Sequence, residues 1–265
     1  MDNTFDRLFY ERGNYIAGID EAGVSDIAGP LISACVILPK IDLHKDNLRI
    51  FEINDSKKIP ERFRKGYAEL VWQNAYAIGI GEVSPVEIDY IGPHSATRLA
   101  MLRAVYACKK INTKKKIVPD FLMVDGNISL RTPIKQVGIP GGDSKSLSIA
   151  AASIVAKVYR DEIMVRLASE HPFYYWESNK GAPCEDHFKG IDVNGILPGI
   201  HRTRVWPFVV NPAEKDKLKM WILRRRKWKK STERRYVEQL CPSITRNELE
   251  IALSSLESPE SMLSL

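Results

Sequence analysis

The sequence predicts an α/β fold with a mixed central sheet flanked by helices and a C-terminal helical extension. Three observations support this fold class. Apolar segments of strand length come first and later alternate with segments of helical spacing, which is the element order of a sheet covered by helices. An alanine-rich segment over residues 147–167 is long enough to lie across the sheet as a helix. After Pro212 the composition changes to a basic segment that contains tryptophan.

Two apolar strands open the predicted sheet. Residues 15–20 form an apolar segment that ends at two adjacent carboxylates, Asp20 and Glu21. Residues 31–38 form a second apolar segment, and Pro39 ends it because proline has no amide hydrogen to give to a sheet. We therefore expect acidic side chains at the end of the first strand, beside the loop that leads to the second.

The next elements alternate between helix and strand. Residues 62–74 have apolar side chains at helical spacing and lead into a third strand over residues 76–83, which completes a meander. Residues 96–108 show helical spacing again. Residues 121–124 are uniformly apolar and end at Asp125, which is typical of a buried central strand.

Four carboxylates stand at the ends of these elements: Asp20, Glu21, Asp125 and Asp143, the last directly before the alanine-rich helix. An ionised carboxylate is costly to bury unless it is paired or binds a metal. Such a cluster would hold two divalent ions, one to activate a water and one to stabilise the leaving 3′ oxygen of a phosphodiester. Ligands that are all oxygen favour Mg²⁺ or Mn²⁺.

Each carboxylate also has a purely structural interpretation. Asp125-Gly126 is a common tight-turn dipeptide, and Asp143 would serve as a cap for the following helix. Glu21 at a strand end would face solvent. Only the joint occurrence of all four in this order favours a catalytic metal site.

Five motifs occur in a fixed order between Tyr15 and Phe208. They are Gly18-Ile-Asp-Glu-Ala-Gly23 with Ala28-Gly-Pro30, Asp55-Ser-Lys-Lys58, Val124-Asp-Gly-Asn127, Gly142-Asp-Ser-Lys145 with Ser148-Ile-Ala-Ala-Ala-Ser-Ile154, and His201-Arg202. Together they resemble the ribonuclease HII (type 2 ribonuclease H) family. The resemblance implies a ribonuclease H-like fold and an endonuclease that hydrolyses the RNA strand of RNA/DNA hybrids with two metal ions. It places the catalytic metal ligands at Asp20, Glu21, Asp125 and Asp143.

Two departures mark this chain as a divergent member. The family's opening loop carries Gly-Arg-Gly, whereas this sequence has Gly23, Val24 and Ser25, followed by Asp26, which adds negative charge beside the phosphate path. A family tyrosine that senses the 2′-hydroxyl is replaced by Ala182. Because these elements distinguish RNA from DNA at one nucleotide, we expect weakened recognition of single ribonucleotides embedded in DNA.

Other side chains are candidates for substrate contact. Lys57 and Lys145 would hold a phosphate beside the carboxylates, although exposed lysines on a protein surface are an equally good interpretation. His201 and Arg202 are candidates for the nucleic-acid side. The aromatic segment 173–176 is expected to be a packed loop, with a substitute stacking platform as the alternative.

The positive charge is concentrated near the C-terminus. The chain carries +6 overall; residues 215–235 carry eleven Lys or Arg and a net +9, residues 236–265 carry −4, and residues 1–214 carry only +1. We therefore divide the chain into a catalytic domain, 1–210, and a basic helical extension, 211–265. The extension would contact phosphates or be a solvated helix, and a protein partner for it is conceivable.

Composition also limits cell location and function. The longest apolar segment, residues 31–38, is too short to span a membrane, and the four cysteines contain no CxxC pair, so we expect a cytoplasmic protein without a zinc knuckle. Three functions stay open: a nuclease for the RNA of hybrids, the same metal site redirected to DNA or a structured nucleic acid, and a non-catalytic hybrid-binding module. The intact carboxylate set favours the first.

Overall fold

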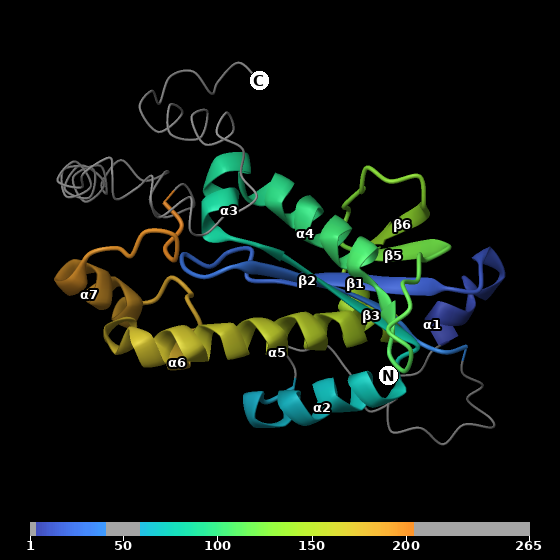
Figure 1. The fold of residues 1–265 in the computed structure, drawn as a ribbon, viewed down its shortest axis with the longest axis horizontal. Coiled ribbons are helices and arrows are strands. Elements are labelled where there is room, and N and C mark those ends of the chain that lie inside the picture. The colour runs from blue at the N-terminus through green and yellow to red at the C-terminus, as the bar shows by residue number, and fades with distance from the viewer. Residues whose placement is uncertain (1–3, 41–58, 204–265) are drawn as a thin grey trace, which may run out of the picture.

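The computed structural model describes residues 4–40 and 59–203, and its centre is one mixed sheet (Figure 1). Its six strands lie in the order β4-β3-β2-β1-β5-β6. The strands are β1 (Ile16–Ala22), β2 (Leu31–Ile37), β3 (Ala77–Val83), β4 (Lys109–Lys110), β5 (Phe121–Asp125) and β6 (Lys135–Ile139). Neighbouring strands from β4 to β1 pair antiparallel, whereas β5 pairs parallel with both β1 and β6. The predicted mixed sheet flanked by helices and the four predicted strands are confirmed, whereas the predicted C-terminal helical extension lies outside the described residues.

Helices cover both faces of this sheet. They are α1 (Thr4–Arg7), α2 (Glu61–Asn74), α3 (Pro85–Ile91), α4 (Pro93–Ala107), α5 (Leu147–Glu170), α6 (Trp176–Asn179) and α7 (Glu185–Asn194). Figure 1 shows α4 on one face and α5 on the other, with α2 packed outside α5. The three helices predicted from spacing correspond to α2, α4 and α5. The prediction missed α3, whose start is fixed by a capping box in which Ser84 and Glu87 exchange hydrogen bonds.

The two faces of the sheet bury different sets of side chains. On the α5 side, Ala34 and Val36 of β2 pack against small residues of α5 such as Ala151. On the α4 side, Cys35 and Ile37 pack against α4. Side chains of a strand alternate between its faces, so β2, with all seven residues buried, lies at the centre of both cores.

The helix α5 lies in backbone contact with β1. A Cβ built on Gly18 would be only 2.1 Å from the carbonyl carbon of Ser148, so no larger residue than glycine fits at this crossing. The alanines that follow Ser148 in α5 allow the same close approach. This contact brings the first turns of α5 to the end of β1 that carries Asp20.

Several sequence predictions concern residues outside the described ranges. Lys57 lies in the segment 41–58, and the basic extension 211–265 lies beyond residue 203. Their predicted roles therefore stay predictions. Among the residues that the structure covers, no helix is long and apolar enough to cross a membrane.

Candidate active site

The candidate acidic site begins where two parallel strands end. Ile19 of β1 pairs with Val124 of β5, so the next residues, Asp20 and Asp125, occupy corresponding positions on neighbouring strands. Adjacent strands lie about 4.8 Å apart, which makes these two carboxylates neighbours. Glu21, the next residue of β1, is half-buried rather than solvent-facing, and its charge acts on Asp20.

The third part of the site is the turn before α5. Asp143 lies in a 3₁₀ turn (Gly142–Ser144) and is 7% exposed. The Gly142 N–H donates a hydrogen bond to Asp125 Oδ1 (2.6 Å), which ties this turn directly to the end of β5. The structure therefore brings together three elements that carry predicted ligands, from the two strand ends and the turn.

The electrostatics of Asp20 reflect this crowding. Its side chain is 5% exposed, and burial, followed by the negative charges of Glu21 and Asp125, raises its pKa well above the ordinary value. The Ser153 hydroxyl of α5 and the Glu21 N–H (2.7 Å from Oδ1) donate hydrogen bonds that oppose this rise. A nearby cation would stabilise the ionised form of the whole group.

The donor chemistry of the site fits a hard divalent cation, because the available groups are carboxylate oxygens. Within residues 4–40 and 59–203, however, no three His, Cys, Asp or Glu side chains form a ready-made ligand group. Asp20 and Asp125 each give one oxygen to a backbone N–H instead. The charges thus favour a cation, while the side-chain arrangement is that of a hydrogen-bonded cluster.

Asp125-Gly126 does bend the chain after β5, with Gly126 at a φ of +74°, as expected for a turn dipeptide, but it does not close a hairpin, because β5 and β6 run parallel. Asp143 is not the cap of α5, because the Ser146 side chain accepts the hydrogen bond from the Ile149 N–H at that position. The assignment of the four carboxylates as metal ligands stays a prediction.

The loop between β1 and β2 is held from beneath by Arg160 of α5. This guanidinium is completely buried and donates hydrogen bonds to the carbonyls of Pro30 (2.9 Å), Lys180 (2.9 Å) and Ala28 (3.0 Å). It also forms an ion pair with Asp26 at 2.7 Å. Asp26 was expected to add negative charge beside the phosphate path, and the ion pair with the buried arginine offsets that charge.

A second buried arginine, Arg202, holds the start of the same loop. Its side chain is 0% exposed and donates to the carbonyls of Gly29 (2.9 Å), Gly23 (2.5 Å) and Val24 (3.2 Å). His201 is 1% exposed. These placements correct the expectation that His201 and Arg202 face the nucleic acid, because both side chains lie below the surface and contact the protein backbone.

A hydrogen-bonded cluster anchors the position of the missing tyrosine. His187 places Nδ1 2.9 Å from the Ala182 carbonyl, accepts a hydrogen bond from the Trp176 indole N–H (2.9 Å) and meets His201 Nε2 at 3.2 Å. Burial, followed by the charge of His187, lowers the pKa of His201 to about 3, so both imidazoles are neutral at ordinary pH. The segment that ends at Ala182 is thereby fixed to the core.

The remaining candidates lie at or near the surface. Lys145 is exposed, and its ammonium donates to the Pro140 carbonyl (2.6 Å), close to the Asp143 turn. In the aromatic segment 173–176, Tyr174 and Trp176 are buried, as predicted for a packed loop, whereas Phe173 (63%) and Tyr175 (53%) are exposed.

Arg160 belongs, with Asp161, to the motif that continues along α5, but its role in holding this loop was not predicted. The available signal was one arginine among apolar neighbours on α5, between Ala156 and Met164 at helical spacing.

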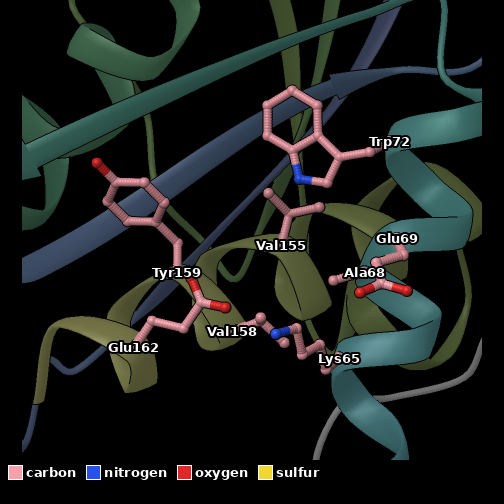
Figure 2. A pocket seen from close by; sticks show the side chains of 8 residues that line it. All are labelled: Lys65, Ala68, Glu69, Trp72, Val155, Val158, Tyr159 and Glu162. Carbon is pink, nitrogen blue, oxygen red and sulfur yellow. The ribbon is translucent and has the colours of Figure 1, made fainter. Parts of the chain in front are cut away.

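A pocket of about 210 Å³ between α2 and α5, lined in part by Trp72 and Tyr159, is separate from the acidic site, since none of the four carboxylates lines it (Figure 2).

Solved structures share this architecture. The ribonuclease H2 from Pyrococcus horikoshii OT3 superposes with a TM-score of 0.60 at 22% identity, covering 81% of this chain and 100% of that chain. Bst ribonuclease HIII in complex with Mn²⁺ gives a TM-score of 0.54 at 17% identity, covering 80% of this chain and 72% of that chain. The fold is therefore that of the ribonuclease H enzymes.

Sequence comparison gives the family. The family model described as ribonuclease HII matches residues 17–205. Ribonuclease HII from Caldanaerobacter subterraneus subsp. tengcongensis is 44% identical over 199 residues, which are 75% of this chain and 77% of that protein. This chain belongs to the ribonuclease HII family. It is accordingly a ribonuclease H, an endonuclease of the class that acts on RNA/DNA hybrids.

Proposed function

We propose that this chain hydrolyses the RNA strand of RNA/DNA hybrids by a two-metal mechanism at Asp20, Glu21, Asp125 and Asp143, and that it acts weakly at single ribonucleotides in DNA. The observation that carries the proposal is the pairing of two strand ends. Asp20 and Asp125 end neighbouring parallel strands, and the Asp143 turn is hydrogen-bonded to Asp125.

The four carboxylates would hold the ions through oxygen. When bound, a pair of divalent ions supplies an activated water and stabilises the leaving 3′ oxygen. Mg²⁺ and Mn²⁺ both suit an all-oxygen site, and Mn²⁺ is the ion present in the Bst ribonuclease HIII structure. Burial of Asp20 disfavours its ionised form until a cation is present, and it strengthens the attraction to a bound cation, because charges interact more strongly away from water.

The chain's own residues would position the substrate beside this site. Arg160 and Arg202 fix the backbone of the loop that starts at Gly23, so the loop would offer a rigid edge to the nucleic acid. Lys145 lies next to the Asp143 turn and would balance the charge of an approaching phosphate. Contacts from this loop and from Lys145 would be made to the sugar-phosphate backbone of a hybrid. They would not depend on one particular 2′-hydroxyl.

The weak action at single ribonucleotides follows from two side chains. Val24 packs against the apolar cluster around Ile27 and Leu31, so its side chain gives no hydrogen bond to a ribose or a phosphate. Ala182 has neither a ring to stack on a sugar nor a hydroxyl to sense one. A continuous hybrid would still bind, because it offers many backbone contacts in place of one local contact.

Cleavage assays with purified full-length protein test this proposal. The substrates are a continuous hybrid, duplex DNA with one ribonucleotide, double-stranded RNA and plain DNA, each with Mg²⁺ and with Mn²⁺. We expect rapid cutting of the hybrid, slow cutting at the lone ribonucleotide, and no cutting by Asp125→Asn. Rapid cutting of plain DNA would support the redirected-site alternative. Metal-independent hybrid binding without cleavage would support a binding module.

The substrate prediction has its own reciprocal test. The double variant Val24→Arg with Ala182→Tyr restores the two side-chain types whose absence, in this proposal, weakens recognition of a single ribonucleotide. Its rate at a single ribonucleotide should rise about 10-fold or more, with little change on continuous hybrid, because a gain of roughly 1.4 kcal/mol in transition-state binding from the two restored side chains is a tenfold gain in rate. Efficient cutting at the lone ribonucleotide by the unaltered chain would refute the substrate prediction while leaving the metal mechanism intact.

A further inference from the structure

Asp6 joins the N-terminal helix α1 to the first turn of α5. Its side chain is 3% exposed, and its carboxylate Oδ2 accepts hydrogen bonds from the Ser148 N–H (2.9 Å) and the Ser148 hydroxyl (2.5 Å). The match to the family model begins at residue 17. The contact is therefore made by a segment that precedes the matched region, onto a helix within it.

The location suits a buried carboxylate. Burial raises the pKa of Asp6, and hydrogen bonds from Ser148 and Ser146 oppose the rise. The first turn of a helix has free N–H groups and a positive dipole end, both of which favour an anion. Phe5 and Phe9, on either side of Asp6, pack into the apolar cluster that contains Ile149 and hold α1 against α5.

Ser148 is also the residue at which α5 crosses β1. The two backbones touch there, since a Cβ on Gly18 would lie 2.1 Å from the Ser148 carbonyl carbon. Gly18 precedes the candidate ligand Asp20 by two positions on the same strand. Further along α5, the Ser153 hydroxyl hydrogen-bonds Asp20. A shift of α5 at Ser148 would therefore move Ser153 relative to Asp20.

The same helical turn is linked to the other two ligand-bearing elements. The Ser146 N–H donates to the Gly142 carbonyl (2.8 Å), and the Gly142 N–H donates to Asp125 Oδ1 (2.6 Å). Asp143 follows Gly142 directly in the chain. The start of α5 is thus connected to Asp143 by one hydrogen-bonded turn. One further hydrogen bond connects that turn to Asp125.

We propose that Asp6 is a positioning residue for the metal site. By fixing Ser148 it sets the placement of α5 against β1, and with it the positions of Asp143 and Ser153 relative to Asp20. Asp6 acts through the helix and contacts neither substrate nor metal. This inference rests on the proposed function, since the metal site itself is proposed there.

Mn²⁺ titration calorimetry on the full chain tests the inference. Asp6→Ala removes both contacts to Ser148 and should weaken Mn²⁺ binding about 10-fold. This is the lower end of the loss seen when residues that support the metal ligands are replaced. Asp6→Asn keeps an acceptor for the helix N–H and should stay within about threefold of wild type, since Asn replaces Asp well at helix starts. Ser148→Ala removes only the hydroxyl contact, and its loss of affinity should lie between these two. Hybrid cleavage should follow the same order.

A matched variant separates positioning from lost stability. Met164→Ala removes a fully buried side chain from the other half of α5 and should lower the midpoint of thermal unfolding without touching the first turn. Its Mn²⁺ affinity should equal that of wild type. Wild-type affinity in both Asp6→Ala and Ser148→Ala would overturn the inference, as would equal weakening in Met164→Ala. If wild type itself neither binds Mn²⁺ nor cleaves hybrid, the proposed function fails, and this inference fails with it.

Discussion

Replacing Arg160 with methionine tests whether one buried guanidinium holds the loop between β1 and β2. Methionine has similar length but donates no hydrogen bond. The change would leave the Ala28, Pro30 and Lys180 carbonyls without their charged donor and Asp26 without its ion-pair partner. Breaking a buried charged network in this way costs about 3–5 kcal/mol, less than the sum of the separate bonds because the buried charge also disappears.

Chemical or thermal unfolding followed by circular dichroism measures this loss. For a domain of this size, 3–5 kcal/mol corresponds to a fall in Tm on the order of 6–20 °C. Arg160→Lys should lose less, since one ammonium retains the charge but cannot span three carbonyls. Arg166→Met on the exposed side of the same helix is the control and should change unfolding by less than about 0.5 kcal/mol. An Arg160→Met protein within about 1 kcal/mol of wild type would refute the reasoning.

Three further predictions concern packing, pH and metal binding. Gly18→Ala should destabilise by about 3 kcal/mol or more because its Cβ meets the Ser148 backbone, whereas Gly66→Ala, with open space around it in α2, should stabilise by about 0.5–1 kcal/mol in the same unfolding assay. The folded-state pKa of His201 is about 3, below its ordinary 6.5, so its contribution to stability is complete above about pH 6.5 and is lost as pH falls toward 3. Denaturation at a series of pH values should show the free energy of unfolding falling by up to about 1.4 kcal/mol per pH unit over this range. An equally steep fall in a folded His201→Gln variant would show that other groups cause the loss of stability. Mg²⁺ at 100 times its Kd should raise the unfolding free energy of wild type by about 2.7 kcal/mol and leave that of Asp143→Asn nearly unchanged; equal shifts in both would place the ion elsewhere.

Local sequence patterns were sufficient for the elements that are buried and regular. The strands β1 and β5 are apolar up to the carboxylates near their ends, β2 is apolar except for Ser33, and α5 is rich in alanine, so burial and period alone locate them. In contrast, β6 has only one buried residue, Ile139, and β4 has two residues in all, so their patterns resemble those of loops. Pairing with a neighbouring strand creates these elements, and pairing is not a local property.

The candidate site shows the same division. Asp20 and Asp125 could be predicted as neighbours because each directly ends an apolar strand. The burial of Arg160 and Arg202 could not, since the carbonyls that they bind come from segments distant in the sequence. The partner of Asp6 is 142 residues away, which no spacing rule reaches. Charged residues are mostly exposed, so sequence reasoning placed Arg202 at the surface by default.

The position of β1 in the sheet has a consequence for how the enzyme folds. This strand pairs with β2, which follows it closely in the sequence, and with β5, which does not. At the start of the parallel pair, the Tyr15 N–H donates a hydrogen bond to Asp120, which lies 105 residues later in the chain. Pairing between strands that are distant in the sequence forms more slowly than pairing between consecutive strands, so we expect the antiparallel meander to form first and the parallel pair later. Asp20 and Asp125 belong to these two stages. Nuclease competence should then appear only in the last folding phase, which would keep incompletely folded chains inactive towards nucleic acid.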